Sequence, residues 1–167
     1  MAIAAGMVHD LDISAAPVAV LARDEIAAVL LESRDNRFVV FVPREGGDWV
    51  APGMTSGTPR RMRDQQEPVT GHVPLAGLAG RGFATAGPDG EPQEFGWFAV
   101  TGQAAADAVE VSSATSVDTV SEPVGDNGLV FAVVRTRMVE RPNGLLTFEK
   151  PTILVHTRDG RSVPMPC

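Results

Sequence analysis

Turn-forming residues divide this chain into short apolar segments. Six such signals occur: Arg34-Asp35-Asn36, Gly46-Gly47, Asp89-Gly90, Asn127-Gly128, Asn143-Gly144 and Asp159-Gly160. Residues of these types tolerate the positive φ angles of tight turns, and the apolar runs between them have the length of strands. The sequence therefore predicts an all-β protein.

The predicted strands are rich in Val and Phe. They cover residues 18–22, 26–31, 37–42, 95–101, 107–111, 129–134 and 152–156. Segments 37–42 and 95–101 are apolar at both odd and even positions, so both faces of each strand are expected to be covered. Segment 107–112 instead alternates, with Val109 and Val111 on one face, which indicates a half-exposed strand.

Residues 24–31 are compatible with two kinds of element. Asp24 could cap a helix whose apolar face holds Ile26, Val29 and Leu30. The segment is short, however, and it lies between two strand-like runs and before a turn signal. A strand is favoured, which gives an antiparallel meander up to residue 52.

The predicted domain organisation has three parts. Residues 1–52 form the N-terminal meander, residues 53–72 form a mobile Arg-bearing loop, and residues 73–167 form a sandwich-like or partly closed barrel unit. Within the last part, the glycine-rich stretch 77–90 is expected to be irregular with at most one short strand. A single core spanning 15–167 is the alternative.

Composition excludes several classes of protein. The chain of 167 residues is 44% hydrophobic and 21% charged, which is typical of a globular protein. It has no apolar run long enough to span a membrane and no secretory signal pattern, so the cytoplasm is the expected compartment. Its net charge of −7 argues against nucleic-acid binding. One cysteine, Cys167, cannot form an internal disulfide or a multi-cysteine metal site.

The order of segments resembles that of small uncharacterised actinobacterial β-rich proteins. The resemblance is carried by the meander at 24–53, EFGWFAVTGQAAADAVEVSS at 94–113, DNGLVFAVV at 126–134 and ILVHTRDGRSVPM at 153–165. It implies a sandwich-like second half and no particular activity. That half also resembles Ig-like sandwich repeats, although the cysteine pair and the tyrosine of true immunoglobulin domains are absent.

No catalytic arrangement is predicted. Ser56 in Gly53-Met54-Thr55-Ser56-Gly57 is one residue away from the spacing of a nucleophile elbow, and His72 and Asp64 are its conceivable partners. A turn explains Ser56 more simply. His156 ends an apolar strand, where a histidine bonded to the backbone is expected.

No metal or cofactor site is predicted either. His9, His72 and His156 are far apart in the sequence and lack a zinc motif. Calcium is the better metal candidate, because four acids lie in or beside glycine-containing turns: Asp89, Glu91, Glu94 and Asp126. The D-x-D-x-D-G spacing is missing, so turn formation is the preferred explanation.

Uneven charge and two tryptophans are the candidate features of a binding surface, although a core position is preferred for Trp49 and Trp97. Residues 82–134 contain eight acids and no Lys or Arg. The candidate partner-binding residues are Arg60, Arg61, Arg63 and Trp97. The sequence thus predicts a non-catalytic binding or accessory module that acts through protein–protein interaction, possessing neither a nucleic-acid partner nor a membrane span. The alternatives are a small hydrolase with a site near 54–94 and a homo-oligomeric structural protein whose copies pair through an exposed edge strand.

Overall fold

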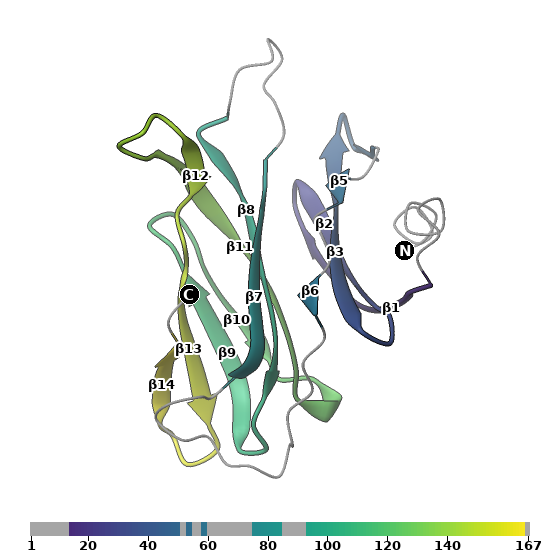
Figure 1. Cartoon of the computed structure of the whole chain (residues 1–167), viewed down its shortest axis with the longest axis vertical. Helices are drawn as coiled ribbons and strands as arrows, with labels where there is room; N and C mark the ends of the chain where they lie inside the picture. The colour runs from purple at the N-terminus through teal and green to yellow at the C-terminus, as the bar shows by residue number, and fades with distance from the viewer. Residues whose placement is uncertain (1–13, 51–52, 55–57, 60–74, 85–92, 166–167) are drawn as a thin grey trace. The chain divides into compact units, whose positions relative to one another are not determined.

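The computed structural model describes residues 14–50, 53–54, 58–59, 75–84 and 93–165. Apart from one short 3-10 turn, the regular elements in these ranges are strands, so the predicted all-β class is confirmed (Figure 1). In the same ranges, no helix has the length and apolar character required to cross a membrane. The chain forms two compact units, residues 1–60 and residues 61–167.

Unit 1 is built on an antiparallel sheet in which β1 to β4 follow one another in chain order. The strands are β1 (Ala16–Arg23), β2 (Ile26–Glu32), β3 (Asn36–Glu45) and β4 (Asp48–Trp49). Two further short strands, β5 (Gly53–Met54) and β6 (Thr58–Pro59), also pair with β3. The predicted meander is confirmed, and the segment that could have been a helix is strand β2.

Local turn chemistry explains the path of this sheet. Asp24 and Glu25 form the two-residue turn between β1 and β2. Between β2 and β3, the Ser33 hydroxyl accepts a hydrogen bond of 3.0 Å from the Asn36 N–H. Serine favours turns because its hydroxyl can satisfy nearby backbone groups.

Strand β3 is buried on both faces, as predicted. On one face Phe38, Val40 and Val42 form a cluster with residues of β2. On the other face Val39 and Phe41 are at most 4% exposed. At the end of the β2–β3 ladder, the buried Arg37 guanidinium forms an ion pair with Glu32 opposite it, which compensates the cost of burying its charge.

Unit 2 contains two four-stranded antiparallel sheets. The first sheet has the order β12-β11-β8-β7 and the second has the order β10-β9-β13-β14. The strands of the first are β7 (Leu75–Phe83), β8 (Phe95–Ala104), β11 (Leu129–Glu140) and β12 (Leu146–Phe148). Those of the second are β9 (Ala108–Ala114), β10 (Thr119–Pro123), β13 (Thr152–Thr157) and β14 (Ser162–Met165).

One apolar core joins these two sheets into a sandwich. Phe98 and Val100 of β8 and Val130, Ala132 and Val134 of β11 come from the first sheet. They cluster with residues of every strand of the second sheet: Ala108, Val111, Val120, Ile153, Val155 and Val163. Alternate residues of each strand therefore point inward, as expected for two packed antiparallel sheets.

The glycine-rich stretch 77–90 was predicted to be irregular with at most one short strand; its described first part lies in one strand, β7, which at nine residues is longer than expected. The glycines serve a packing purpose. A Cβ atom on Gly82 would collide with the Phe148 ring, and one on Gly80 would collide with the Phe98 ring. Glycine is thus found in this strand because aromatic rings from other strands occupy the space of its missing side chains.

The predicted orientation of β9 also needs correction. Val109 and Val111 were expected on one face, yet Val109 is 40% exposed whereas Val111 is 1% exposed. The β9–β13 register shifts between His156 and Thr157, so a bulge lies beside Val109. A bulge inserts one residue and thereby reverses the face of those beyond it. Strands β10, β12 and β14 were not predicted, since each is short and weakly apolar.

Burial of the unit 2 core can be tested with two valines of opposite exposure. Val100→Ala should lower the free energy of unfolding by about 2 kcal/mol, because Val100 is fully buried and the change leaves a cavity. Val109→Ala is the matched control and should cost less than about 0.5 kcal/mol. Urea unfolding would be followed by fluorescence in a Trp49→Phe background, where Trp97 of β8 reports on unit 2. An equal decrease in the free energy of unfolding in the two variants would contradict the assigned core.

Candidate functional site

Trp97, the described member of the predicted partner-binding residues, lies in the inner strand β8 of the first sheet of unit 2. The register places it between Phe83 of β7 and Arg135 of β11. Directly opposed residues of an antiparallel pair point to the same face. Phe95 and Arg137 are opposed in the same way, two residues away. We call these five residues, Phe83, Phe95, Trp97, Arg135 and Arg137, the Arg–aromatic surface.

Cation–π contacts organise this surface. The Arg135 guanidinium carbon lies 4.9 Å from the Phe95 ring centroid, and that of Arg137 lies 5.6 Å from it. Phe83, Phe95 and Trp97 are half-buried and the two arginines are largely exposed, in contrast to Ala99 further along β8, which is 1% exposed. The prediction that both faces of this strand are covered thus holds beyond Trp97 but not at Phe95 and Trp97.

Acidic neighbours hold the two arginines at the sheet. The Arg135 backbone N–H donates a hydrogen bond of 2.9 Å to the Asp118 carboxylate. An Arg137 guanidinium nitrogen lies 3.4 Å from a Glu94 carboxylate oxygen, and both side chains are substantially exposed. An exposed pair of this kind contributes little net stability, so a carboxylate from a partner could replace Glu94 at small cost.

The other predicted partner-binding residues, Arg60, Arg61 and Arg63, lie outside the residues that the structure describes. The same is true of Ser56 and His72, which were weighed as catalytic residues, and of Cys167. Their roles stay predictions.

His156 is not bonded to the backbone as expected; it is part of a row of side chains across the second sheet of unit 2. Its Nε2 atom lies 2.6 Å from the Ser112 hydroxyl and its Nδ1 atom 2.9 Å from the Ser162 hydroxyl. Ser112 also lies 2.8 Å from the Ser121 hydroxyl. The row connects all four strands of the sheet. Sequence reasoning missed it because its members come from four separate segments.

A serine bonded to a histidine suggests a nucleophile, but the surroundings of Ser112 do not support one. The group at Nδ1 is the hydroxyl of Ser162, whereas a catalytic histidine is commonly oriented by a carboxylate. Ser112 lies on β9 and is opposed by Ser121 on one side and Leu154 on the other. Backbone N–H groups of such an inner strand are used by the ladders and cannot form an oxyanion hole. The row is therefore best explained as a polar network that stabilises the sheet.

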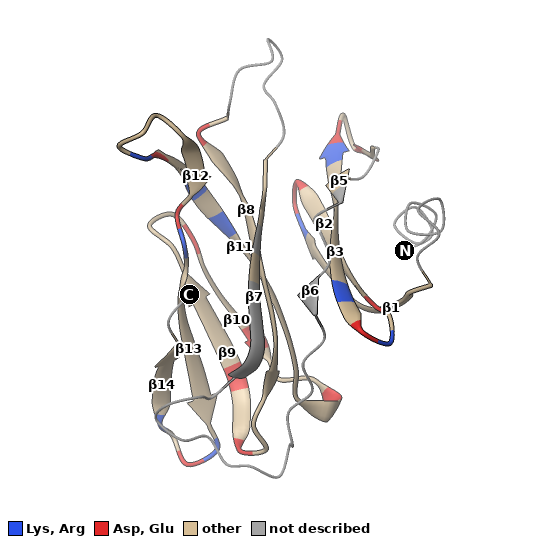
Figure 2. Ribbon diagram, viewed as in Figure 1, with Lys and Arg blue, Asp and Glu red and all other residues tan. Residues whose placement is uncertain are grey.

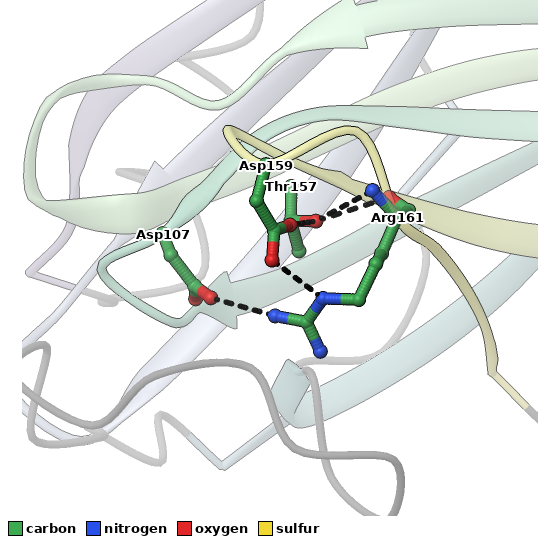
Figure 3. A network of polar contacts seen from close by, with 4 residues as sticks. All are labelled: Asp107, Thr157, Asp159 and Arg161. Atoms are coloured by element: carbon green, nitrogen blue, oxygen red, sulfur yellow. Dashed lines mark hydrogen bonds and ion pairs between the residues drawn. The ribbon is translucent and has the colours of Figure 1, made fainter.

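A second polar network lies at the end of unit 2 where the β8–β9 and β13–β14 turns meet (Figure 3). Arg161 Nε lies 2.8 Å from Asp159 Oδ2, and a terminal nitrogen of Arg161 lies 3.5 Å from Asp107 Oδ2. The Thr157 hydroxyl donates to the other Asp159 oxygen. Hydrogen bonds from Thr157 and Arg161 favour the carboxylate and lower the pKa of Asp159. The network fixes the two turns to each other.

Next to this network is a pocket of about 310 Å³. The residues that line it are small and uncharged: Ala104, Ala105, Ala106, Ala108, Val124, Gly125 and Gly128. The part of the lining that the structure describes provides space but no side-chain charge with which to orient a polar ligand.

Of the four acids that were considered for calcium, Asp89 and Glu91 lie outside the described residues, and the two that are described, Glu94 and Asp126, are not brought together. Glu94 precedes β8 and pairs with Arg137 at the end of β11, whereas Asp126 precedes the start of β11. Because β8 and β11 are antiparallel, these two acids lie at opposite ends of the β8–β11 pair. In the described ranges, no group of three or more His, Cys, Asp or Glu residues is arranged to hold a metal ion.

Comparison of the chain with protein-family models, with curated proteins and with solved structures finds no match. The resemblance to actinobacterial β-rich proteins stays a prediction.

The Asp159 network makes a testable prediction. Thr157→Val removes a hydrogen bond to the carboxylate, so the pKa of Asp159 should rise towards its ordinary value of 3.8. A lowered pKa stabilises the fold above the ordinary value, and this contribution is lost as pH falls through the lowered pKa. The variant should therefore lose less stability on acidification. NMR titration of the side-chain carboxyl carbon would measure the pKa.

Thr152→Val on the same strand is the control for this titration, because Thr152 takes no part in the network. An unchanged pKa of Asp159 in the Thr157→Val protein would show that the hydroxyl does not contribute.

Proposed function

We propose that this chain is a non-catalytic protein-binding module that docks to another protein through the Arg–aromatic surface. The observation that carries the proposal is the register of β7, β8 and β11, which places Trp97 between Phe83 and Arg135 on one face of a sheet. Trp and Arg are the residues most often found at the energetic centre of protein interfaces.

The sheet restricts the side chains of this surface before a partner binds, which lowers the conformational entropy lost on binding. Phe95 and Trp97 are half-buried side chains of an inner strand, and Arg135 and Arg137 are positioned over the Phe95 ring. Less side-chain freedom remains to be lost when a partner binds. Aromatic rings supply contact area, and guanidinium groups stacked on a ring keep their N–H donors available at the edge.

The chemistry of the surface indicates an acidic partner. Arginine binds carboxylates through two parallel hydrogen bonds, which gives both affinity and orientation. Both arginines lie immediately beyond the stretch 82–134, which contains acids and no basic residue, so they are the first basic side chains along the chain after it (Figure 2). An extended segment with carboxylates and an apolar side chain fits the guanidinium groups and the Trp97 ring together.

Selection from a random peptide library tests this proposal. We expect the chain to enrich acidic peptides and these peptides to change the fluorescence of Trp97 in a Trp49→Phe background. Arg135→Ala and Arg137→Ala should each weaken binding about tenfold, the effect of a central interface residue. Arg141→Ala is the matched control, because Arg141 is an exposed arginine beyond the end of β11. Enrichment without acidic preference, or equal affinity in all three variants, would contradict the proposal.

The cluster Arg60, Arg61 and Arg63 is proposed to add to the same interaction, since its charge has the same sign. Replacing all three with Gln should weaken binding of the selected peptides relative to the unaltered chain. It should also make the affinity less sensitive to salt. Affinity would be measured at low and at high salt concentration. Unchanged affinity at both would show that these arginines take no part in the interaction.

A further inference from the structure

Strand β1 is an edge strand whose exposed positions are apolar. Within the described part of the chain it pairs with β2 alone. Its alternate residues Ala16, Val18, Val20 and Ala22 are exposed, with Val18 at 44% and Val20 at 40%. Residues 16–22 carry no charge, and Arg23 at the end is the one charged residue of the strand. An uncharged apolar edge of this length is a surface on which another strand can pair.

The other edge strands described here carry features that hinder such pairing. Strands β4 and β12 have two and three residues, β10 ends in Glu122 and Pro123, and β14 contains Pro164. The nine-residue edge strand β7 carries Arg81 and a bulge between Ala76 and Ala79. Short strands, charges and prolines are the usual protection of a sheet edge. In β1 the comparable features are Pro17 and a bulge between Pro17 and Ala19, both at its beginning. Val18 is the bulged residue, so the stretch without such a feature runs from Ala19 to Ala22.

Backbone groups of this stretch are directed away from β2. In a hairpin closed by a two-residue turn, the residues that flank the turn exchange backbone hydrogen bonds, and the direction then alternates along the strand. Arg23 and Ile26 flank the turn between β1 and β2. The N–H and C=O groups of Ala22 and Val20 therefore point to the outer side of β1.

We propose that β1 pairs in antiparallel orientation with β1 of a second copy of this chain, about a two-fold axis at Val20. In this register Val20 is opposite Val20 of the partner, and Val18 is opposite the partner's Ala22. The exposed apolar residues of the two strands then lie on one face as cross-strand pairs. The dimer is closed, because each copy uses the same strand.

Charge placement favours a second copy as the occupant. Arg23 would be opposite Pro17 of the partner, and the two Arg23 residues would be about 20 Å apart, six residues along a strand. No like charges are opposed. Parallel pairing would instead place the two Arg23 residues side by side. An acidic partner, which fits the Arg–aromatic surface, has no matching charge between Val18 and Ala22.

The interface is small, so the dimer should be weak and reversible. A pairing of five residues falls below the size of a standard protein interface, and a dissociation constant on the order of 100 µM is expected. Sedimentation velocity from about 1 µM to about 1 mM protein covers this range. The full-length chain should change from monomer to dimer across it.

Val20→Lys tests the role of β1, because it opposes two lysines on the axis and should raise the dissociation constant at least about tenfold. Val109→Lys is the matched control: Val109 has the same 40% exposure but lies on β9 of unit 2. It should dimerise as the unaltered chain does. A chain that stays monomeric at about 1 mM, or a Val20→Lys protein that dimerises normally, would overturn the proposal.

Cysteine cross-linking tests the register in a Cys167→Ala background. Val20→Cys lies on the axis and should form a disulfide-linked dimer on mild oxidation. Ala22→Cys should not, since the two residues 22 would be about 13 Å apart, beyond disulfide reach. Val109→Cys controls for random collision. Cross-linking of Ala22→Cys at the rate of Val20→Cys would overturn the register. Adding Arg135→Ala should leave the cross-linking of both cysteine variants unchanged, because β1 pairing does not depend on the Arg–aromatic surface.

Discussion

The register between β8 and β11 is the interaction on which the arrangement of unit 2 depends. It runs from the Leu129–Gln103 pair to the Arg137–Phe95 pair. Even-numbered residues of both strands face the sandwich core, and odd-numbered residues face the other side, where the Arg–aromatic surface lies. A slip of one residue would move Phe98 and Val100 out of the core and Trp97 into it. The same backbone pairing thus determines the core and the candidate binding surface together.

Sequence patterns predicted the fold class, the N-terminal meander and most long strands, because apolar runs between turn residues are local signals. Positive φ angles occur in four of the six predicted turns, at Gly46, Gly47, Asn127, Gly128, Gly144 and Gly160. The turn at 34–36 has none, and Asp89-Gly90 lies outside the described residues. The departures from prediction arose where tertiary contacts, and not the local sequence, determine whether a strand forms or which face a residue occupies. Strand β7 contains glycines that accommodate distant rings, and the exposure of Val109 follows from a bulge formed against β13. Neither the rings nor the opposing strand can be identified from the neighbouring sequence.

The candidate site was predicted only in part. Trp97 was selected from its size and chemistry, and the spacing of Phe95 with Trp97, and of Arg135 with Arg137, places each pair on one face of its strand. That the two pairs oppose each other depends on the β8–β11 register, which joins segments about forty residues apart. The Ser112–His156 row, in contrast, could not be predicted from the sequence at all. Its geometry is visible only in the structure, and the ladders on both sides of β9 then argue against catalysis there.

Two different kinds of recognition are assigned to the two units. The Arg–aromatic surface acts through side-chain charge and aromatic area, so its affinity should fall as ionic strength screens the guanidinium groups. Pairing of β1 acts through backbone hydrogen bonds and apolar contact, which salt weakens little. One chain could therefore hold its copies together through unit 1 and bind a partner reversibly through unit 2. Two linked copies would present two Arg–aromatic surfaces, and a partner with two acidic segments would then gain avidity without any new contact.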